Sequence, residues 1–236
     1  MKIYVGTSGY AYKEWKGIFY PEKIQPKEML RFYSNHLGAV EINNTFYRMP
    51  TENILTSWAE QVPDNFTFAF KAPQAITHLK RLRNVKTETE YLLRTLSVLE
   101  SRLGPILFQF PNSFHANLPA IKDFLMLLPR TMSCAFEFRS PSWVEAGVAD
   151  ILSEKGFCLC TTDSDESPPN QIIRTAPWGY LRLRRPDYTD ADLAEWRTKI
   201  LSQEWEKVFV FFKHEDETKG PEMALRFKEL ISVVPS

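Results

Sequence analysis

The sequence predicts an α/β protein, a (β/α)8 TIM-like barrel formed by a single domain over residues 1–236. Three observations carry this prediction. Short runs rich in β-branched and aromatic residues alternate eight times with stretches of helical period. The connections are short, which is typical of parallel strands joined by right-handed crossovers. The first strand is followed by Gly6-Thr7-Ser8-Gly9, whereas the alternative, an open doubly wound sheet, is expected to carry a G-x-G-x-x-G turn there.

Eight segments are predicted as strands because they are rich in β-branched and aromatic residues. They are 3–6, 39–43, 66–71, 106–110, 134–138, 157–161, 180–184 and 208–212. Side chains alternate between the two faces of a strand, so three phenylalanines of 66–71 share one face and Lys71 lies on the other. The apolar face of a barrel strand contacts the helices, and we therefore expect the polar face to point inward.

The predicted helical segments begin and end at residues that favour helix termini. Thr87 and Glu90 have the spacing of a capping box ahead of a leucine-rich helix, and Ser142 with Glu145 repeats that spacing. Gly156 is expected to be a C-terminal cap. The other helical segments are 26–38, 51–63, 119–129, 189–203 and 221–231. Only 163–178, which contains Pro168-Pro169, shows no helical period, so a regular helix is expected to be missing between strands six and seven.

Composition excludes several classes of protein. Hydrophobic residues make up 44% of the 236 residues and aromatic residues 14%, which is too apolar for a disordered chain. Lys and Arg number 29 and balance 29 Asp and Glu, so bulk charge favours neither nucleic acid nor a membrane surface as partner. No apolar run approaches the ~20 residues of a membrane span, and the first six residues are too short for a secretory core.

The three cysteines indicate a reducing compartment. An odd number of cysteines on a large core argues against a disulfide framework, so we expect a cytoplasmic protein. Cys134 begins a strand and is expected to lie in the core. Cys158 and Cys160 share one strand face, which we expect to pack against the helices rather than to form a redox pair.

The inward-facing strand positions collect polar side chains, most of them late in their strands. The set comprises Glu41, Asn43, Lys71, Gln109, Glu137, Arg139, Asp163, Arg182, Arg184 and Lys213. Barrel enzymes build their sites at the C-terminal ends of the strands. Burying an ion costs several kcal/mol and apolar fillers are often as stable, which favours a functional pocket over mere packing. Three acids face five bases in this set, so the expected ligand is anionic: a phosphate, a carboxylate or a nucleic-acid backbone.

Several unusual strings occur in an order that resembles the YecE-like family, the domain of unknown function numbered seventy-two. They include VGTSGY (5–10), VEINNTFY (40–47), LFQFP (107–111) and EFR (137–139). The resemblance covers nearly the whole chain and implies a TIM-like barrel, but no reaction, since none is established for the family. Two segments depart from the commoner pattern. Leu183-Arg184-Arg185 stands where a His-Gly pair is frequent, and Lys213-His214 opens a segment where Asn is more usual.

Metal-assisted hydrolysis is one chemistry that the inward set can support. One Mg²⁺ or Mn²⁺ would be held by Glu41, Glu137 and Asp163, because carboxylates at strand ends are suitable ligands for these cations. Further candidate ligands are His78, His214 and Asp216. The chain has only four histidines, so a multi-zinc site rich in histidine is not expected.

Metal-free acid–base chemistry is a second possibility. Glu41 and Glu137 would take opposite roles if their environments separate their pKa values, while Arg139 and Arg182 clamp an anion. Lys71 is a candidate for Schiff-base formation, since burial and cationic neighbours deprotonate a lysine. The competing interpretation, which we favour, is an ion pair between Lys71 and Glu41 or Glu137.

A non-catalytic module that binds nucleic acid or another anionic ligand is the alternative from another class. His78, Lys80, Arg81 and Arg83 would form a basic loop, and Tyr10, Tyr12 and Trp15 would stack on bases. The simpler interpretation is a solvated loop, with aromatic residues that cover the barrel, and the neutral net charge favours it.

The sequence therefore predicts an enzyme that acts on a phosphorylated or other anionic substrate at the C-terminal mouth of the barrel. A hydrolase of the phosphoester type is favoured over a lyase or an isomerase. The predicted catalytic residues are Glu41, Glu137, Lys71 and Asp163. The predicted substrate-binding residues are Asn43, Gln109, Arg139, Arg182, Arg184, Lys213, Tyr10, Trp15 and His78.

Overall fold

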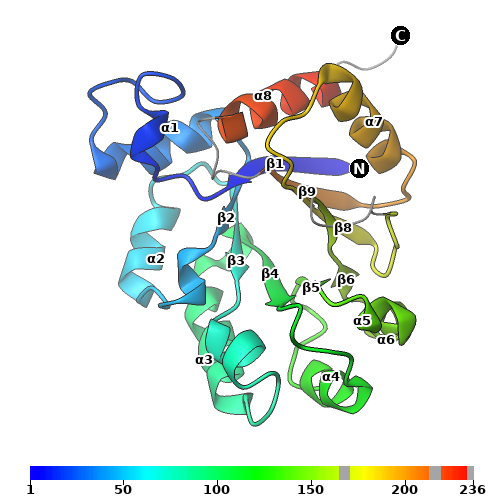
Figure 1. The fold of residues 1–236 in the computed structure, drawn as a ribbon. Coiled ribbons are helices and arrows are strands. Elements are labelled where there is room, and N and C mark those ends of the chain that lie inside the picture. Colours follow the sequence, from blue (N-terminus) through cyan, green and yellow to red (C-terminus); the bar gives the residue numbers. More distant parts are fainter. Residues whose placement is uncertain (165–170, 213–218, 233–236) are drawn as a thin grey trace.

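The computed structural model of the protein describes residues 1–164, 171–212 and 219–232. Within these ranges one parallel sheet has the strand order β6-β5-β4-β3-β2-β1-β9-β8-β7. Its strands are β1 (Lys2–Ser8), β2 (Ala39–Ile42), β3 (Thr67–Lys71), β4 (Leu103–Phe110), β5 (Cys134–Phe138), β6 (Cys158–Leu159), β7 (Thr161–Asp163), β8 (Trp178–Leu183) and β9 (Lys207–Phe212). Only Cys160 separates β6 from β7 in the chain, so the sheet curves into a nearly closed barrel (Figure 1). The predicted fold class is confirmed, with the sixth strand divided in two.

Helices surround the strands (Figure 1). The α-helices are α1 (Met29–His36), α2 (Glu52–Ala59), α3 (Lys86–Leu96), α4 (Leu118–Leu125), α5 (Ser142–Glu145), α6 (Val148–Lys155), α7 (Asp190–Leu201) and α8 (Lys219–Ser232). Short 3-10 turns occur at Lys13–Trp15, Pro26–Glu28, Asn44–Phe46 and Ser97–Arg102, and a π-helical turn occurs at Ala75–Leu79. Each predicted helical segment contains an observed helix. Between β7 and β8 the described residues, 164 and 171–177, contain no helix, as predicted.

The predicted helix caps are only partly correct. Gly156 has a φ of 73° and caps α6 in the left-handed conformation, as expected. The capping box at Thr87 is wrong, because α3 follows Val85 and has no side-chain cap. Ser142 does not cap α5 either, since its hydroxyl accepts the backbone N–H of Ala116.

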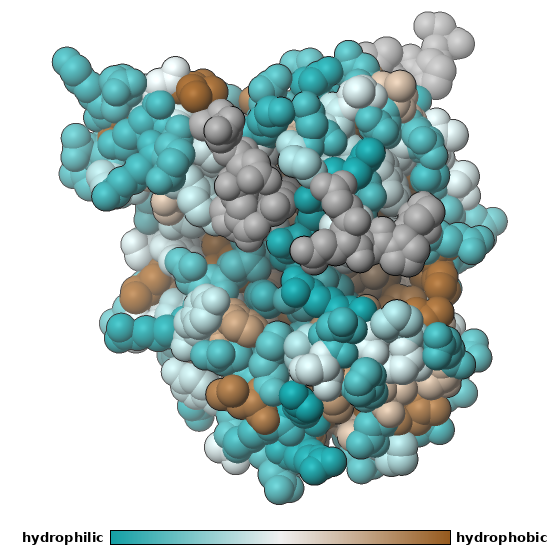
Figure 2. Space-filling model, viewed as in Figure 1, coloured by the Kyte–Doolittle hydropathy of each residue, from teal (hydrophilic) through white to brown (hydrophobic). Residues whose placement is uncertain are grey.

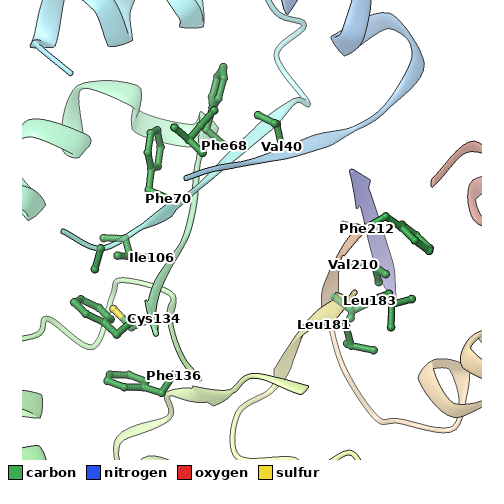
Figure 3. Packing of buried hydrophobic residues seen from close by; sticks show 14 of the residues in the cluster. Val40, Phe68, Phe70, Ile106, Cys134, Phe136, Leu181, Leu183, Val210 and Phe212 are labelled. Carbon is green, nitrogen blue, oxygen red and sulfur yellow. The ribbon is translucent and has the colours of Figure 1, made fainter. Parts of the chain in front are cut away.

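The outward faces of the strands form the main hydrophobic core. Figure 3 shows such residues on β2, β3, β4, β5, β8 and β9. Phe68 and Phe70 are fully buried on β3, and parallel pairing aligns Phe68 with Val40 of β2. Burying side chains of this size contributes about 1.5–3 kcal/mol each, so the alternation expected from the sequence also accounts for the packing of helices on the sheet.

The inward faces form a second, smaller hydrophobic cluster. Its region is called here the lower part of the barrel, and the region of the C-terminal mouth the upper part. The cluster consists of Ala39, Ala69, Leu107, Ala135, Cys158, Ala176, Trp178, Tyr180, Phe209 and Phe211, with Tyr4 and Cys160 packed against it. The expectation that Cys158 and Cys160 face the helices is therefore wrong. The β5–β6 register explains this, because it pairs Cys158 with the inward residue Ala135 and Leu159 with the outward residue Phe136.

The outer surface is mostly hydrophilic in the view of Figure 2, with hydrophobic residues in separate patches. Among the described residues, no helix is both long and apolar enough to span a lipid bilayer.

Candidate functional site

Three charged side chains from β2, β5 and β8 meet inside the upper part of the barrel. Arg182 donates from Nη2 to Glu41 Oε1 at 2.9 Å and from Nη1 to Glu137 Oε2 at 2.7 Å. The exposed fractions of Glu41, Glu137 and Arg182 are 0%, 5% and 1%. Inward positions that are far apart in sequence thus form one buried ion cluster, called here the Glu–Arg–Glu cluster. The convergence that strand alternation predicted for these three residues is observed.

Glu41 accepts hydrogen bonds at both of its carboxylate oxygens. Ser8 Oγ donates to Oε1 at 2.9 Å, Asn43 Nδ2 donates to Oε1 at 3.1 Å, and Tyr180 Oη donates to Oε2 at 2.7 Å. Asn43 was in the predicted set, whereas Tyr180 and Ser8 were missed as site residues. Tyr180 shares the inward face with Arg182, so strand alternation alone was a sufficient signal for it.

Glu137 has two further partners, one buried and one at the rim. Gln109 Nε2 donates to Glu137 Oε1 at 2.9 Å, and β4–β5 pairing places the two residues side by side. Arg139 Nε lies 3.8 Å from the same oxygen, and the Arg139 side chain is about half exposed at 49%. Arg139 therefore keeps most of its hydrogen-bonding capacity for solvent or a ligand at the mouth.

Both carboxylates of the cluster are held in the ionised form. Burial by itself raises the pKa of Glu41, but Arg182 and the hydrogen bonds from Tyr180 and Ser8 outweigh it and lower the pKa to about 2. The pKa of Glu137 is also lowered, because Arg182 outweighs burial there too. Neither pKa is raised, so neither glutamate has the raised pKa of a general acid, and the opposite acid–base roles stay a prediction.

The carboxylates are also poorly arranged to bind a metal. Both are bound by the guanidinium group of Arg182, which occupies the space between them. Among the residues that the structure describes, no three His, Cys, Asp or Glu side chains lie close enough together to hold a metal ion. His214 and Asp216, two of the candidate ligands, lie outside the described residues.

Lys71 ends β3 at the mouth of the barrel. Its Nζ lies 4.2 Å from the centroid of the Phe46 ring, and its backbone carbonyl accepts a hydrogen bond from Thr45 Oγ1 at 2.6 Å. In the described part of the chain Lys71 forms no ion pair with Glu41 or Glu137, so that expectation is wrong; both carboxylates bind Arg182 instead.

The amine of Lys71 is less basic than that of an ordinary lysine. Burial and the charge of Arg182 lower its pKa to about 8, although Glu41 and Glu137 act in the opposite direction. A substantial fraction of this amine is therefore neutral near physiological pH.

His78 lies beside this lysine in the π-helical turn after β3. Its ring centroid is 4.7 Å from that of Phe46, and its Nδ1 is 2.8 Å from Thr77 Oγ1. Burial, Lys71 and Arg139 lower the pKa of His78 to about 4, so the ring is neutral at physiological pH. The sequence proposed His78 as a ligand-binding residue, and it lies at the mouth.

The backbone that follows His78 is strained. Arg81, Leu82 and Asn84 have φ values of 46°, 68° and 53°, in the left-handed region that non-glycine residues rarely adopt. Strain of this kind and π-helical turns both concentrate at functional sites. No sequence pattern indicated this feature of the β3–α3 connection.

Asp163 does not join the cluster. Its carboxylate accepts hydrogen bonds from Arg185 Nε and Trp196 Nε1, each at 3.1 Å. The predicted inward orientation is wrong, because the β7–β8 register pairs Asp163 with the outward residue Leu183. Asp163 is thus separated from Glu41 and Glu137, the two glutamates with which it was expected to act.

The aromatic residues proposed to stack on bases instead cover the barrel. Trp15 is 1% exposed and packs against Tyr12, Phe19 and Tyr20, so its assignment to a binding surface is wrong. Tyr10 is half-buried, with its ring near those of Tyr33 and Trp58.

The remaining predicted basic residues are dispersed. Lys80 forms an ion pair with Glu88, and the guanidinium of Arg81 donates to Ser113. Arg184 follows β8, and its backbone N–H donates to the carbonyl oxygen of Asp163 at 2.7 Å. Lys213 lies outside the described residues.

The fold and the site together define a parallel α/β barrel with a buried Glu–Arg–Glu cluster and a lysine at its C-terminal mouth. The chain belongs to the family described as "Protein of unknown function DUF72", whose model matches residues 4–235. The resemblance seen in the sequence is confirmed. The family description assigns no reaction, so the chemistry has to be argued from the site.

Two curated relatives of the chain carry the group name UPF0759. The chain is similar to the UPF0759 protein YecE of Escherichia coli strain K12, with 30% identity over 156 residues, which cover 66% of this chain and 55% of that protein. It is also similar to the UPF0759 protein YunF of Bacillus subtilis strain 168. The alignment is 272 residues long with 28% identity, and it covers 98% of this chain and 95% of the relative.

Solved structures agree with this family membership. A DUF72 family protein from Thermotoga maritima MSB8 has a TM-score of 0.85 at 26% identity and covers 99% of this chain and 100% of that one. A DUF72 family protein from Enterococcus faecalis V583 has a TM-score of 0.80 at 20% identity, with 99% and 98% covered, and supports the fold alone.

Proposed function

We propose that this chain is an enzyme that acts on a phosphorylated or other anionic small molecule at the C-terminal mouth of its barrel, with Lys71 as the reactive base. The observation that carries the proposal is the state of Lys71. Its amine is half-buried at the mouth, rests on the Phe46 ring, and has a pKa of about 8. Groups with perturbed pKa values of this kind are concentrated at active sites.

The charges around Lys71 favour an anionic substrate. Two inward carboxylates, Glu41 and Glu137, face three cations, Arg182, Lys71 and Arg139. With Lys71 protonated, three positive charges against two negative ones leave one positive charge in excess, and Arg139 is the cation whose side chain is half exposed at the rim. A phosphate or carboxylate group bound between Lys71 and Arg139 would gain charge-assisted hydrogen bonds.

A buried acceptor at the mouth supports a substrate that also carries a hydroxyl group. Asn43 Oδ1 is buried and has no hydrogen-bond partner among the described residues, while its Nδ2 donates to Glu41. The ionised carboxylate of Glu41 can only accept, so the amide cannot be turned round without losing that bond. A substrate hydroxyl or bound water is the kind of donor that would satisfy Asn43 Oδ1.

Phosphoester hydrolysis, the reaction favoured by the sequence, requires a base that removes a proton from the attacking water. Glu41 and Glu137 are weak bases because their pKa values are lowered. Lys71 is the stronger candidate, since a base is most effective when its pKa lies near the working pH. In this proposal the Glu–Arg–Glu cluster forms the inner end of the site, and Lys71 removes the proton from the attacking water.

Assays of a panel of phosphomonoesters and phosphodiesters test the proposal. We expect Lys71→Met to lower kcat/KM by about 10²–10⁴, the usual contribution of a general base. In the unaltered protein kcat/KM should rise with pH through about 8, because the neutral amine is the active form. Lys122→Met, which alters an exposed lysine on α4, is the matched control and should keep full activity.

The alternative function, a non-catalytic ligand-binding module, gives a different result in the same experiment. Inorganic phosphate would still bind, as measured by calorimetry, and no substrate in the panel would turn over in any variant. That outcome would contradict phosphoester hydrolysis as the reaction of this site.

A further inference from the structure

His78 lies in the π-helical turn Ala75–Leu79, which follows β3 at the mouth of the barrel. We propose that the Nε2–H group of His78 donates a hydrogen bond to an anionic oxygen of the substrate, and that the hydroxyl group of Thr77 holds the ring in the tautomer that can do so. This inference rests on the proposed function and deepens it, because it adds a neutral hydrogen-bond donor to the cations Lys71 and Arg139.

The hydroxyl group of Thr77 decides which nitrogen of the ring carries the proton. Thr77 is fully buried, and its Oγ1 lies 2.8 Å from His78 Nδ1. In the described part of the chain Thr77 Oγ1 has no other hydrogen-bond partner. If Nδ1 donated the hydrogen bond, the hydroxyl hydrogen of Thr77 would be buried without an acceptor, which is unfavourable. The hydroxyl therefore donates to Nδ1, and in the neutral ring the proton is on Nε2.

The turn itself brings these two side chains together. On a regular α-helix consecutive side chains do not face each other, whereas Thr77 and His78 are in contact in the π-helical turn. The turn is closed by a hydrogen bond of 3.0 Å from the backbone N–H of Leu82 to the carbonyl oxygen of Ile76, and Ile76 is fully buried. The ring of His78 is therefore anchored on a fixed backbone.

The other nitrogen of the ring is accessible to a ligand. Nε2 forms no hydrogen bond within the described ranges, and it is not among the buried polar atoms that lack a partner, so it is exposed to solvent. The ring of Phe46 lies edge-to-face with His78, 4.7 Å away between centroids, and 4.2 Å from Lys71 Nζ. His78 and Lys71 thus share one neighbour and lie at the same part of the mouth.

A neutral donor suits the charges around it. Burial and three cations lower the pKa of His78 to about 4, so the ring carries no charge at physiological pH. The cations are Lys71, Arg139 and Arg81. An N–H group adds a hydrogen bond to an anion without adding repulsion among these cations. The other tautomer would present the lone pair of Nε2, which repels an anionic oxygen, so the tautomer decides whether His78 binds the substrate.

NMR spectroscopy of the full chain, labelled with ¹⁵N at histidine, tests the tautomer. The chain has four histidines, and the signals that disappear in His78→Gln are those of His78. We expect Nε2 to be the protonated nitrogen and its signal to shift when inorganic phosphate is added. Thr77→Val removes the hydroxyl group and keeps the shape of the side chain, so the tautomer protonated at Nδ1 should gain population. Thr77→Ser should restore the original tautomer.

Calorimetry with inorganic phosphate tests the binding role. His78→Leu should lower the affinity about tenfold or more, because it removes a hydrogen bond to a charged group. His78→Gln, which carries an N–H donor at a similar reach, should recover most of this loss. Thr77→Val should weaken binding by the same factor by which it lowers the population of the tautomer protonated at Nε2. A merely structural role of Thr77 would not produce that proportion.

A second histidine provides the matched control. His36 lies at the C-terminal end of α1, just before β2 begins, and therefore at the opposite end of the barrel from the mouth. His36→Leu should leave the phosphate affinity unchanged. The melting temperature of each variant shows that the variant is folded at the temperature of the binding measurement.

The outcomes separate this inference from the proposed function. A proton on Nδ1 of His78 in the unaltered chain, or equal phosphate affinities of His78→Leu and His78→Gln, would overturn the inference. If Lys71→Met abolishes turnover of a phosphoester while His78→Leu keeps the affinity and kcat/KM of the unaltered chain, hydrolysis stands and the role of His78 is wrong. If His78→Leu weakens phosphate binding as expected and no ester is turned over, His78 binds the anion and hydrolysis fails.

Discussion

The lower and upper halves of the barrel interior are built from the same strands and have opposite characters. In the lower half, aromatic rings fill the space, with Tyr4 and Phe209 stacked at 4.7 Å between ring centroids. In the upper half, Glu41, Glu137 and Arg182 occupy the equivalent inward positions. The lower half shows that this barrel can be filled with apolar residues, so the ions above are not required for packing.

The two halves also differ in energetic terms. Burying aromatic side chains stabilises the barrel by about 1.5–3 kcal/mol for each residue. Removing an ion from water costs several kcal/mol, and an ion pair recovers this only with good geometry and further hydrogen bonds. The upper half meets that requirement for the two glutamates, whose hydrogen bonding is completed by Ser8, Tyr180 and Gln109. Among the described residues, Nε of Arg182 is buried without a partner. The upper half is stable but sensitive to the loss of any one member.

The largest expected effect is that of removing the shared cation. Arg182→Met leaves two buried carboxylates without a counter-ion, and we expect it to lower the free energy of unfolding by about 3–5 kcal/mol or more in urea denaturation. Arg182→Lys keeps the charge but cannot bridge both glutamates, so an intermediate loss is expected.

A surface pair provides the control for this experiment. Arg174 is bound to Glu204 at 3.0 Å, and both side chains are well exposed. Arg174→Met should therefore change the stability by less than about 1 kcal/mol. An equally small loss for Arg182→Met would show that water reaches the Glu–Arg–Glu cluster.

The next effect is a dependence of stability on acid pH to which, of the two halves, the upper one contributes. The pKa of Glu41 is lowered in the folded chain to about 2, so its contribution is present above the unfolded pKa of about 4.3 and is lost as the pH falls towards 2. The contribution is on the order of 3 kcal/mol. Urea denaturation at intervals from pH 6 to pH 2.5 measures it.

The comparison of two variants isolates the source of this dependence. Glu41→Gln should make the acid limb shallower, since it removes one titrating group, while Glu137 and Asp192, whose pKa values are also lowered, keep part of the dependence. Phe209→Leu, in the lower half, should destabilise the chain by a similar amount at every pH, because the change in packing involves no titration. A Glu41→Gln profile as steep as that of the unaltered chain would assign the acid sensitivity to other carboxyl groups.

The fold and the three members of the Glu–Arg–Glu cluster could be predicted because strand alternation is a local property. Glu41 and Glu137 each lie between outward apolar neighbours, so their inward direction follows from the sequence. Asp163 could not be placed, because the sixth strand is interrupted at Cys160 and its register with β8 decides which residues face inward. Where a strand is short and broken, its pattern of residues is too weak to fix the face.

The partners within the site could not be predicted, because they depend on distances across the barrel. Whether Arg182 reaches both glutamates, or Lys71 reaches either, is set by strand tilt and side-chain length rather than by order in the sequence. The contact between Lys71 and Phe46 depends on the 3-10 turn at Asn44–Phe46, which turns the ring towards β3. The same sequence information therefore locates the site but leaves its pairing open.

The smallest expected effect on stability concerns Arg139, at the outer limit of the upper half. Its Nε is 3.8 Å from Glu137 and its side chain is half exposed, so Arg139→Met should change the free energy of unfolding by less than about 1 kcal/mol. The affinity of the Arg139→Met variant for inorganic phosphate, measured by calorimetry, should nevertheless be about tenfold or more below that of the unaltered chain. The reason is that a hydrogen bond to a charged group contributes about 1.5–3 kcal/mol. Unchanged phosphate affinity would place the anion elsewhere. A large loss of stability would instead assign Arg139 to the buried cluster. Arg139 would then belong to the structural interior of the barrel and not to the ligand-binding rim.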